Sequence, residues 1–206
     1  MKPFASLLLT ICLMTTGFFA GAQKALDPNN PIVYLGIDFS ALKIINEPRI
    51  TAMDVKTQYQ AINQLVVAEA KKYDWATALG MPNYSSDIGV TMARNEQADI
   101  SHVFTTNTAD DAHLKEDDIK KMVAKYNFQG KKGTGLIVFY ETFNKGSETG
   151  SMWVTFVDIG TKKVLLTERM SGSAKGFSVR NYWTAPVYKV IQDVKKYKAS
   201  EWRSKI

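Results

Sequence analysis

Residues 133–183 read GTGLIVFYETFNKGSETGSMWVTFVDIGTKKVLLTERMSGSAKGFSVRNYW, and they carry the strongest structural signal in the chain. Runs rich in β-branched and aromatic residues are separated here by polar, glycine-containing turns, which is typical of consecutive antiparallel strands. The runs are residues 136–143, 152–159 and 163–170. The first run is apolar without a break from Leu136 to Tyr140, which favours a central strand covered on both faces.

The rest of the chain adds one strand and three helices to this pattern. Residues 32–40 form an apolar run, and apolar residues recur at helical spacing over 53–79 and 114–126. A last helix is expected to begin near Pro186, because proline is tolerated in a first turn. We therefore predict a single α/β (α+β) domain over residues 23–206. It would have a mixed β-sheet with an antiparallel three-strand meander and helices packed mainly on one face.

The amino-terminal residues 1–22 match a secretory signal peptide. Lys2 supplies a positive charge, residues 4–19 are mostly apolar, and Ala20-Gly21-Ala22 fits the small-x-small cleavage pattern. Threonines and a glycine interrupt the apolar stretch, which argues against a membrane anchor. A lipoprotein would use Cys12, but apolar sequence continues after it. We expect a periplasmic or secreted protein with no stable membrane insertion after signal cleavage.

Composition excludes several function classes. Cys12 is the only cysteine, so residues 23–206 can form no disulfide and no cysteine-based catalytic or metal site. The net charge is +6, but lysines and arginines are scattered among acids, which argues against a nucleic-acid partner. His102 and His113 show no ligand spacing, and no phosphate loop, dinucleotide fingerprint or hydrolase elbow is present. We expect no metal and no cofactor.

The segment Arg180-Asn181-Tyr182-Trp183 is the densest candidate for partner binding, because arginine, tyrosine and tryptophan are enriched at binding hot spots. Neighbours in an extended segment point to opposite sides. We therefore expect Trp183 to be buried beneath the last helix, and Tyr182 with Arg180 to face outward. The alternative is structural: both aromatic residues would anchor the helix on the sheet while Arg180 pairs with an acid.

Three acids form an alternative site. Asp38 lies at the carboxyl end of an apolar run, where open α/β sheets bind ligands. Glu141 and Asp158 occupy similar positions near strand ends and could approach each other across the hairpin. Two carboxylates within about 5–10 Å in a deep pocket would fit a glycosidase-like hydrolase. Capping of a loop by Asp38 and cross-strand pairing of the other two acids are the structural alternatives.

Residues 34–40, 133–136, 171–177 and 180–183 resemble a group of uncharacterised secreted proteins from Bacteroidetes-type bacteria. The resemblance covers most of residues 23–206 and implies an envelope or secreted location, but no activity. The order of strands and helices is also similar to the small α/β domains of periplasmic envelope-assembly proteins, such as the amino-terminal domain of TolB and the curli secretion lipoproteins. That likeness is topological and carries no residue across.

These observations favour a non-enzymatic binding or interaction module of the cell envelope, whose partner would be an envelope protein or a small ligand. A carboxylate-dependent hydrolase and a carrier of small apolar ligands are the alternatives. A carrier would need a closed apolar cavity of about 300 Å3 or more.

Processing of the leader can be tested directly. Amino-terminal sequencing of the protein from its native host is expected to begin at Gln23, directly after the cleavage pattern. A product that starts at a lipid-modified Cys12 would contradict the secretion prediction and place the protein on a membrane.

Overall fold

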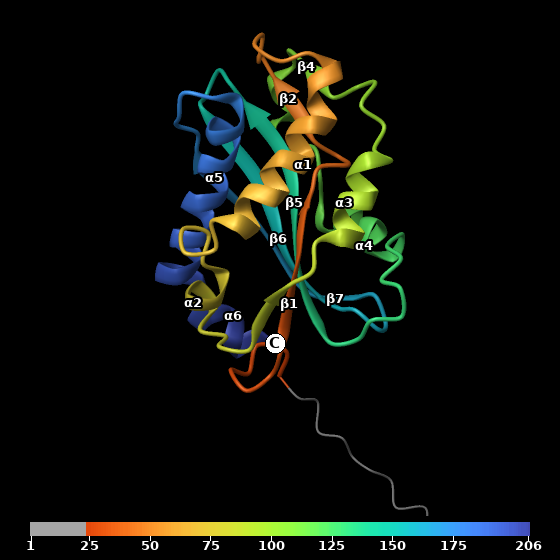
Figure 1. Ribbon diagram of the computed structural model, residues 1–206, viewed down its shortest axis with the longest axis vertical. Coiled ribbons are helices and arrows are strands. Elements are labelled where there is room, and N and C mark those ends of the chain that lie inside the picture. The colour runs from red at the N-terminus through yellow and green to blue at the C-terminus, as the bar shows by residue number, and fades with distance from the viewer. Residues whose placement is uncertain (1–23) are drawn as a thin grey trace, which may run out of the picture.

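The computed structural model describes residues 24–206, so the signal peptide predicted for residues 1–22 lies outside the described residues. The domain is built on a seven-stranded sheet (Figure 1). Its strands are β1 (Ile32–Asp38), β2 (Lys43–Ile45), β3 (Tyr84–Ser86), β4 (Phe104–Thr105), β5 (Thr134–Asn144), β6 (Thr149–Asp158) and β7 (Lys163–Ser173). The helices are α1 (Ala52–Ala68), α2 (Trp75–Leu79), α3 (Gly89–Glu96), α4 (Glu116–Ala124), α5 (Val179–Asp193) and α6 (Ala199–Lys205), with a 3-10 turn η1 (Thr108–Ala112) and a π-helical turn η2 (Val194–Lys198).

The sheet is mostly parallel. β1 pairs in parallel with β3 and β5, and β2 pairs in parallel with β4 and β5. β6 runs antiparallel along one whole edge of β5 and then pairs with β7. Because a strand has only two edges, β1 and β2 must follow one another along the other edge of β5. The outer border of the sheet on that side is formed first by β3 and then by β4.

The predicted sheet organisation is therefore wrong. The prediction was a mixed sheet with an antiparallel three-strand meander, whereas the strand order β3-β1-β5-β2-β4 is parallel throughout. Antiparallel pairing is confined to the side of the sheet formed by β5, β6 and β7. The reason is that parallel neighbours come from distant parts of the chain, so a local pattern of strands and turns does not reveal them.

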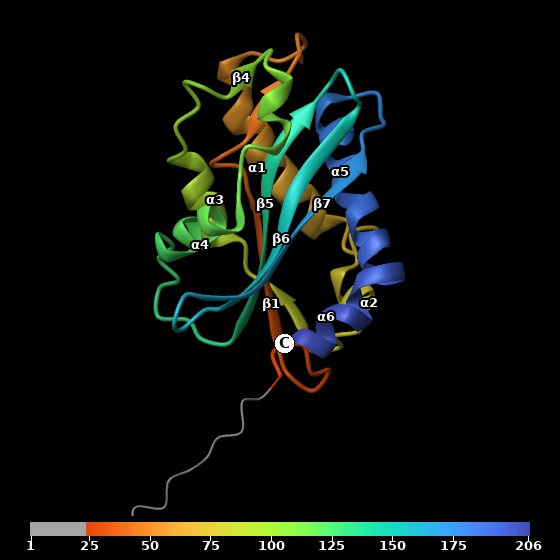
Figure 2. The same ribbon diagram turned by 180° about the vertical axis from the view of Figure 1, so that it is seen from behind.

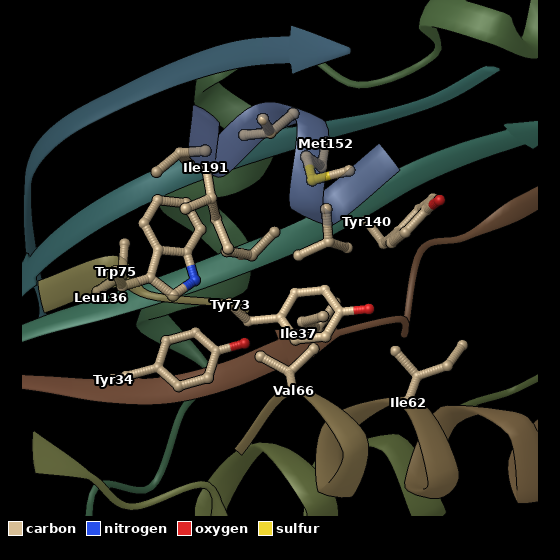
Figure 3. Close-up of a cluster of buried hydrophobic side chains, with 14 of the residues drawn as sticks. Tyr34, Ile37, Ile62, Val66, Tyr73, Trp75, Leu136, Tyr140, Met152 and Ile191 are labelled. Atoms are coloured by element: carbon tan, nitrogen blue, oxygen red, sulfur yellow. The ribbon is translucent and has the colours of Figure 1, made fainter. Parts of the chain in front are cut away.

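Helices cover both faces of the sheet, so the expectation that they pack mainly on one face is also wrong. Alternate residues of β5 enter two separate cores, Leu136 and Tyr140 on one face and Ile137 and Phe139 on the other. The larger core lies beneath α1, α2, α5 and α6, and Figure 3 shows side chains of α1, α5 and the strands meeting there. The smaller core packs against α3 and α4, which lie on the opposite side from α5 in Figures 1 and 2.

A glycine pair brings α5 close to the sheet. Gly150 of β6 lies opposite Gly172 of β7, and both lie beneath Pro186 of α5. A Cβ atom at Gly172 would lie 2.5 Å from the carbonyl oxygen of Pro186, so no larger residue fits. α5 begins at Val179, earlier than predicted, because Ser178 caps it by accepting a hydrogen bond from the Asn181 N–H. Pro186 therefore lies inside the helix and packs into the glycine pair.

The predicted long helix over residues 53–79 is divided in two. α1 ends at Ala68, and after a turn Asp74 starts α2 by accepting a hydrogen bond from the Thr77 N–H. Gly80 ends α2 in the left-handed conformation.

Two buried asparagines complete the outer edge of β1. Gly36, at φ +105°, interrupts the register with β5, and beyond it β3 no longer pairs with β1. Asn63 of α1 accepts a hydrogen bond from the Ile37 N–H (2.7 Å) and donates to the Ile37 carbonyl (2.9 Å). Asn95 of α3 accepts from the Phe39 N–H (2.8 Å) and donates to the same Ile37 carbonyl (2.8 Å). Side-chain amides thus replace a neighbouring strand at this edge.

Removal of one amide should cost stability. Asn63→Ala leaves the buried Ile37 N–H without an acceptor, so we expect the free energy of unfolding to fall by about 2–4 kcal/mol in urea titrations. Gln64→Ala, an exposed neighbour on α1, should change it by less than about 0.5 kcal/mol. Equal effects of the two substitutions would show that the amide does not hold the edge.

Candidate functional site

One hollow of the described surface lies where parallel strands end. β2 runs parallel to both β4 and β5, so the carboxyl ends of these strands meet at one end of the domain, near the β2 and β4 labels in Figure 1. A groove with a volume of about 860 Å3 opens there. We call it the carboxyl-end groove. Its apolar wall is formed by Ile44, Pro48, Ile50 and Phe104, and its polar wall by Asn46, Glu47, Thr105 and Thr106.

The groove combines apolar surface with a few polar groups, as ligand sites commonly do. Ile44 and Ile50 are buried, whereas Phe104 is 39% exposed although its ring is large and apolar. Two further large apolar side chains, Met53 in the first turn of α1 and Phe177 just before α5, are almost fully exposed. An exposed aromatic side chain beside an apolar hollow indicates a surface that a binding partner can cover.

Among the described strands, β4 pairs only with β2, so its other edge is open. The Ile44 N–H donates to the Val103 carbonyl (2.7 Å) and the Asn46 N–H donates to the Thr105 carbonyl (3.2 Å). Those carbonyl groups face β2, and main-chain groups of successive strand residues point to opposite sides. The N–H and C=O of Phe104 therefore point away from β2. Such an edge can pair with another extended segment.

An ion pair between the buried Glu47 carboxylate and the partly exposed Arg49 side chain lies in the connection that follows β2. The Glu47 carboxylate accepts hydrogen bonds from the backbone N–H (3.0 Å), Nε (2.8 Å) and Nη2 (2.6 Å) of Arg49. Burial acts to raise the pKa of Glu47, but the hydrogen bonds and positive charge of Arg49 outweigh it, so the pKa is lowered overall. The pair therefore holds Pro48 and its neighbours in one conformation.

Arg49 also belongs to a cluster around Tyr182 in the first turn of α5. The Tyr182 hydroxyl donates to Glu148 (3.1 Å) and accepts from the Lys145 ammonium (3.0 Å). The Arg49 guanidinium lies 5.0 Å and the Lys145 ammonium 4.4 Å from the centre of the Tyr182 ring. Glu47, which lines the groove, links this cluster to the groove through Arg49.

The predicted arrangement of Arg180, Tyr182 and Trp183 needs correction. The segment is helical, because Ser178 starts α5 before it, and is not the extended segment that was expected. Trp183 is buried, as predicted, and Arg180 is exposed. Tyr182 was expected to face outward but is only 4% exposed, since both aromatic rings lie within the wide apolar stripe of the helix. Partner binding by these three residues remains a prediction.

Asp38 lies at the carboxyl end of β1 and is fully buried. Its Oδ2 accepts hydrogen bonds from Arg94 Nε (2.7 Å) and from the Tyr126 hydroxyl (2.7 Å), and its Oδ1 accepts from the Ser40 N–H (2.7 Å). Burial, and to a smaller extent the Asp38 charge, raise the pKa of Tyr126 well above its ordinary value, which keeps that hydroxyl a donor.

Glu141 is also buried, at a β-bulge of β5. It accepts hydrogen bonds from Arg169 Nε (2.5 Å), from the Leu114 N–H (2.8 Å) and from the Ser151 hydroxyl (3.3 Å). Glu141 thereby holds the segment that leads into α4 against β5 and β7.

Asp158 ends β6 and binds the turn that follows. It accepts hydrogen bonds from the Thr161 N–H (2.7 Å) and hydroxyl (2.8 Å), and these bonds lower the pKa of Asp158. Asp158 lies opposite Thr134 at the start of β5, whereas Glu141 lies near the end of that strand. The predicted approach of Glu141 and Asp158 across the hairpin is therefore wrong, and each of the three acids has its own set of donors.

Glu47, Arg49 and Phe104 were not predicted as site residues. The only local signal is an acid and an arginine on either side of Pro48. Within residues 24–206, no group of three or more His, Cys, Asp or Glu residues is arranged to hold a metal ion. None of the helices in that same range combines the length and the apolar character that a membrane crossing requires.

Two solved structures are similar to the chain over most of its length. One, from Helicobacter pylori, is described as a neuraminyllactose-binding hemagglutinin homologue; it is 12% identical with a TM-score of 0.34, and the match covers 88% of this chain and 92% of the other. The second is lipoprotein GNA1162 from Neisseria meningitidis, 14% identical with a TM-score of 0.35, covering 82% and 98%. At these values neither supports an argument about function. No protein-family model and no curated protein matches the chain.

The Glu47–Arg49 pair should give a pH-dependent stability. Arg49→Met leaves the buried carboxylate without its cation, and we expect a loss of about 2–3 kcal/mol at pH 7, reduced from the usual cost because Arg49 is 39% exposed. Because the folded pKa of Glu47 is lowered, the stabilisation is complete above the ordinary glutamate pKa of 4.5 and is lost as the pH falls through the lower folded pKa.

The difference between wild type and Arg49→Met in urea titrations should therefore shrink on acidification. Lys72→Met, which removes the exposed pair between Lys72 and Glu69, serves as control and should change stability by less than about 0.5 kcal/mol. A loss for Arg49→Met that stays constant from pH 7 to about pH 3 would contradict the role assigned to Glu47.

Proposed function

We propose that the chain is a non-enzymatic binding protein of the cell envelope, and that its carboxyl-end groove holds an extended peptide segment of a partner protein. The observation that carries the proposal is the open edge of β4 beside an apolar groove of about 860 Å3. A peptide strand can pair with the outward main-chain groups of Phe104, as in other complexes formed by strand addition. Its apolar side chains would then cover Ile44, Ile50 and the Phe104 ring.

The groove is better suited to a peptide than to a small apolar molecule. It is open to solvent, whereas a carrier encloses its ligand. Thr105 and Thr106 add hydrogen-bonding side chains along the same edge. The conformation of the wall is fixed beforehand by the Glu47–Arg49 pair, which lowers the entropic cost of binding.

The hydrolase alternative finds less support. Asp38 and Glu141 each accept a hydrogen bond from an arginine, and Asp158 binds its own turn. None of the three acids is among the residues that line the groove. The proposed location in the envelope rests on the signal-peptide pattern of residues 1–22.

Proline substitution separates main-chain pairing from side-chain contact. The Phe104 N–H points outward, so Phe104→Pro should fold normally, because proline is tolerated on a strand edge. Peptides selected from a random library on the wild-type protein should lose at least about tenfold in affinity for Phe104→Pro, since strand pairing needs that N–H. Phe104→Val, which keeps the N–H, should bind more tightly than Phe104→Pro.

Met53→Ala is the matched control, because it removes an exposed apolar side chain that does not line the groove. Its peptide affinity should stay within about twofold of wild type. Equal affinities of Phe104→Pro and Phe104→Val, or selected peptides that protect no amide near residue 104 from hydrogen exchange, would contradict the proposed function.

A further inference from the structure

Three arginines hold buried carboxylates, but they do not use their nitrogens alike. The pairs are Arg49–Glu47, Arg169–Glu141 and Arg94–Asp38. Arg49 places both Nε and Nη2 on its carboxylate, and Arg169 uses Nε for its carboxylate and Nη2 for the Asp111 carbonyl. Arg94 uses Nε alone, and its two Nη atoms have no hydrogen-bond partner within the described chain. The edge of the Arg94 guanidinium that is formed by its two Nη atoms is therefore free to donate two parallel hydrogen bonds.

The orientation of Arg94 is fixed in advance. Its Nε donates to the buried Asp38 carboxylate, and its guanidinium lies 5.0 Å from the centre of the Tyr126 ring. Asp38 is itself held by the Tyr126 hydroxyl and the Ser40 N–H. The Arg94 side chain is only 22% exposed. Binding of a ligand to the Nη atoms therefore costs little conformational entropy of the Arg94 side chain.

Arg94 lines a pocket of about 290 Å3 that is separate from the carboxyl-end groove. We call it the Arg94 pocket. Other polar side chains around it are Gln97, Lys125, Asn127 and Gln129. None of the described residues that line it carries a carboxylate, and Asp38 beneath it balances the charge of Arg94. Lys125 therefore leaves the pocket with an excess positive charge.

Two helices end at this pocket, since Gln97 is the C-cap of α3 and Lys125 is the C-cap of α4. The carboxyl ends of helices carry partial negative charge and disfavour anions. An anion bound here must therefore be held by the side chains of Arg94 and Lys125. This requirement favours a ligand whose geometry matches a guanidinium group.

We propose that the Arg94 pocket binds a small organic carboxylate, with its two oxygens on the Nη atoms of Arg94 and near the ammonium group of Lys125. A carboxylate matches a guanidinium edge through two parallel hydrogen bonds. The pocket lies at the carboxyl end of β1, the position where open α/β sheets bind ligands. Its volume restricts the ligand to a small acid. This site is independent of the proposed peptide groove.

A titration with sodium succinate tests the proposal, with sodium chloride keeping the ionic strength constant. NMR spectra should show saturable shifts of the Arg94 Nε–H signal and of backbone amides around Gln97 and Asn127. Lys125→Ala should weaken succinate binding by about five- to tenfold, because it removes a charge-assisted contact. Lys121→Ala removes a lysine of the same helix α4 that does not line the pocket, and it should stay within about twofold of wild type.

Arg94→Lys keeps a cation beside Asp38, but its ammonium group cannot donate the two parallel hydrogen bonds of a guanidinium. A folded Arg94→Lys protein should therefore show no saturable succinate binding. If that variant does not fold, the comparison of succinate affinity between Lys125→Ala and Lys121→Ala tests the proposal. The proposal is overturned if wild type shows no saturable shift, or if the two α4 variants lose affinity equally. Saturation by inorganic phosphate but not by succinate would show that the ligand class is wrong. Phe104→Pro should leave succinate binding unchanged, which keeps this test separate from that of the groove.

Discussion

The fold depends on two side-chain amides that take the place of a strand. Beyond the bulge at Gly36, the outer edge of β1 would carry unpaired main-chain groups inside the protein, and each buried unpaired group costs about 1–3 kcal/mol. Asn63 and Asn95 satisfy those groups from α1 and α3. The same bonds fix the two helices at the edge, where α1 joins the larger core and α3 joins the smaller one. Because Arg94 precedes Asn95, this docking also places its guanidinium against Asp38.

Local sequence patterns predicted the features that follow from the spacing of apolar residues along the chain. The apolar run in β5 and the burial of Trp183 were predicted, because alternating or helical spacing of apolar residues reports directly on burial. The parallel order could not be predicted, since β1 and β5 are brought together by contacts between distant residues. The role of the Asn63 amide could not be predicted from the sequence either. An asparagine in a helix looks the same in sequence whether its amide faces solvent or completes a sheet edge.

The site was harder to predict than the fold, because its parts are joined only by packing. The groove combines the connection after β2 with the short strand β4, and the Tyr182 cluster adds the β5–β6 turn and the start of α5. The error over Tyr182 came from placing the helix start at Pro186. Gly150 and Gly172 explain that error, because they make room for a proline within the helix, and their pairing across two strands is a tertiary feature.

Buried ion pairs are weak evidence for stability, since desolvation offsets much of the attraction between the charges. Their use in this protein differs from pair to pair. The Glu47–Arg49 pair lies in a wall of the groove, and the Glu141–Arg169 pair attaches a loop to the sheet. In both pairs the arginine uses Nε and Nη2 for hydrogen bonds within the protein. The Asp38–Arg94 pair differs from both, because the two Nη atoms of Arg94 face a polar pocket and have no hydrogen-bond partner in the described chain. In the proposal above, the oxygens of a carboxylate ligand supply the acceptors for those two groups.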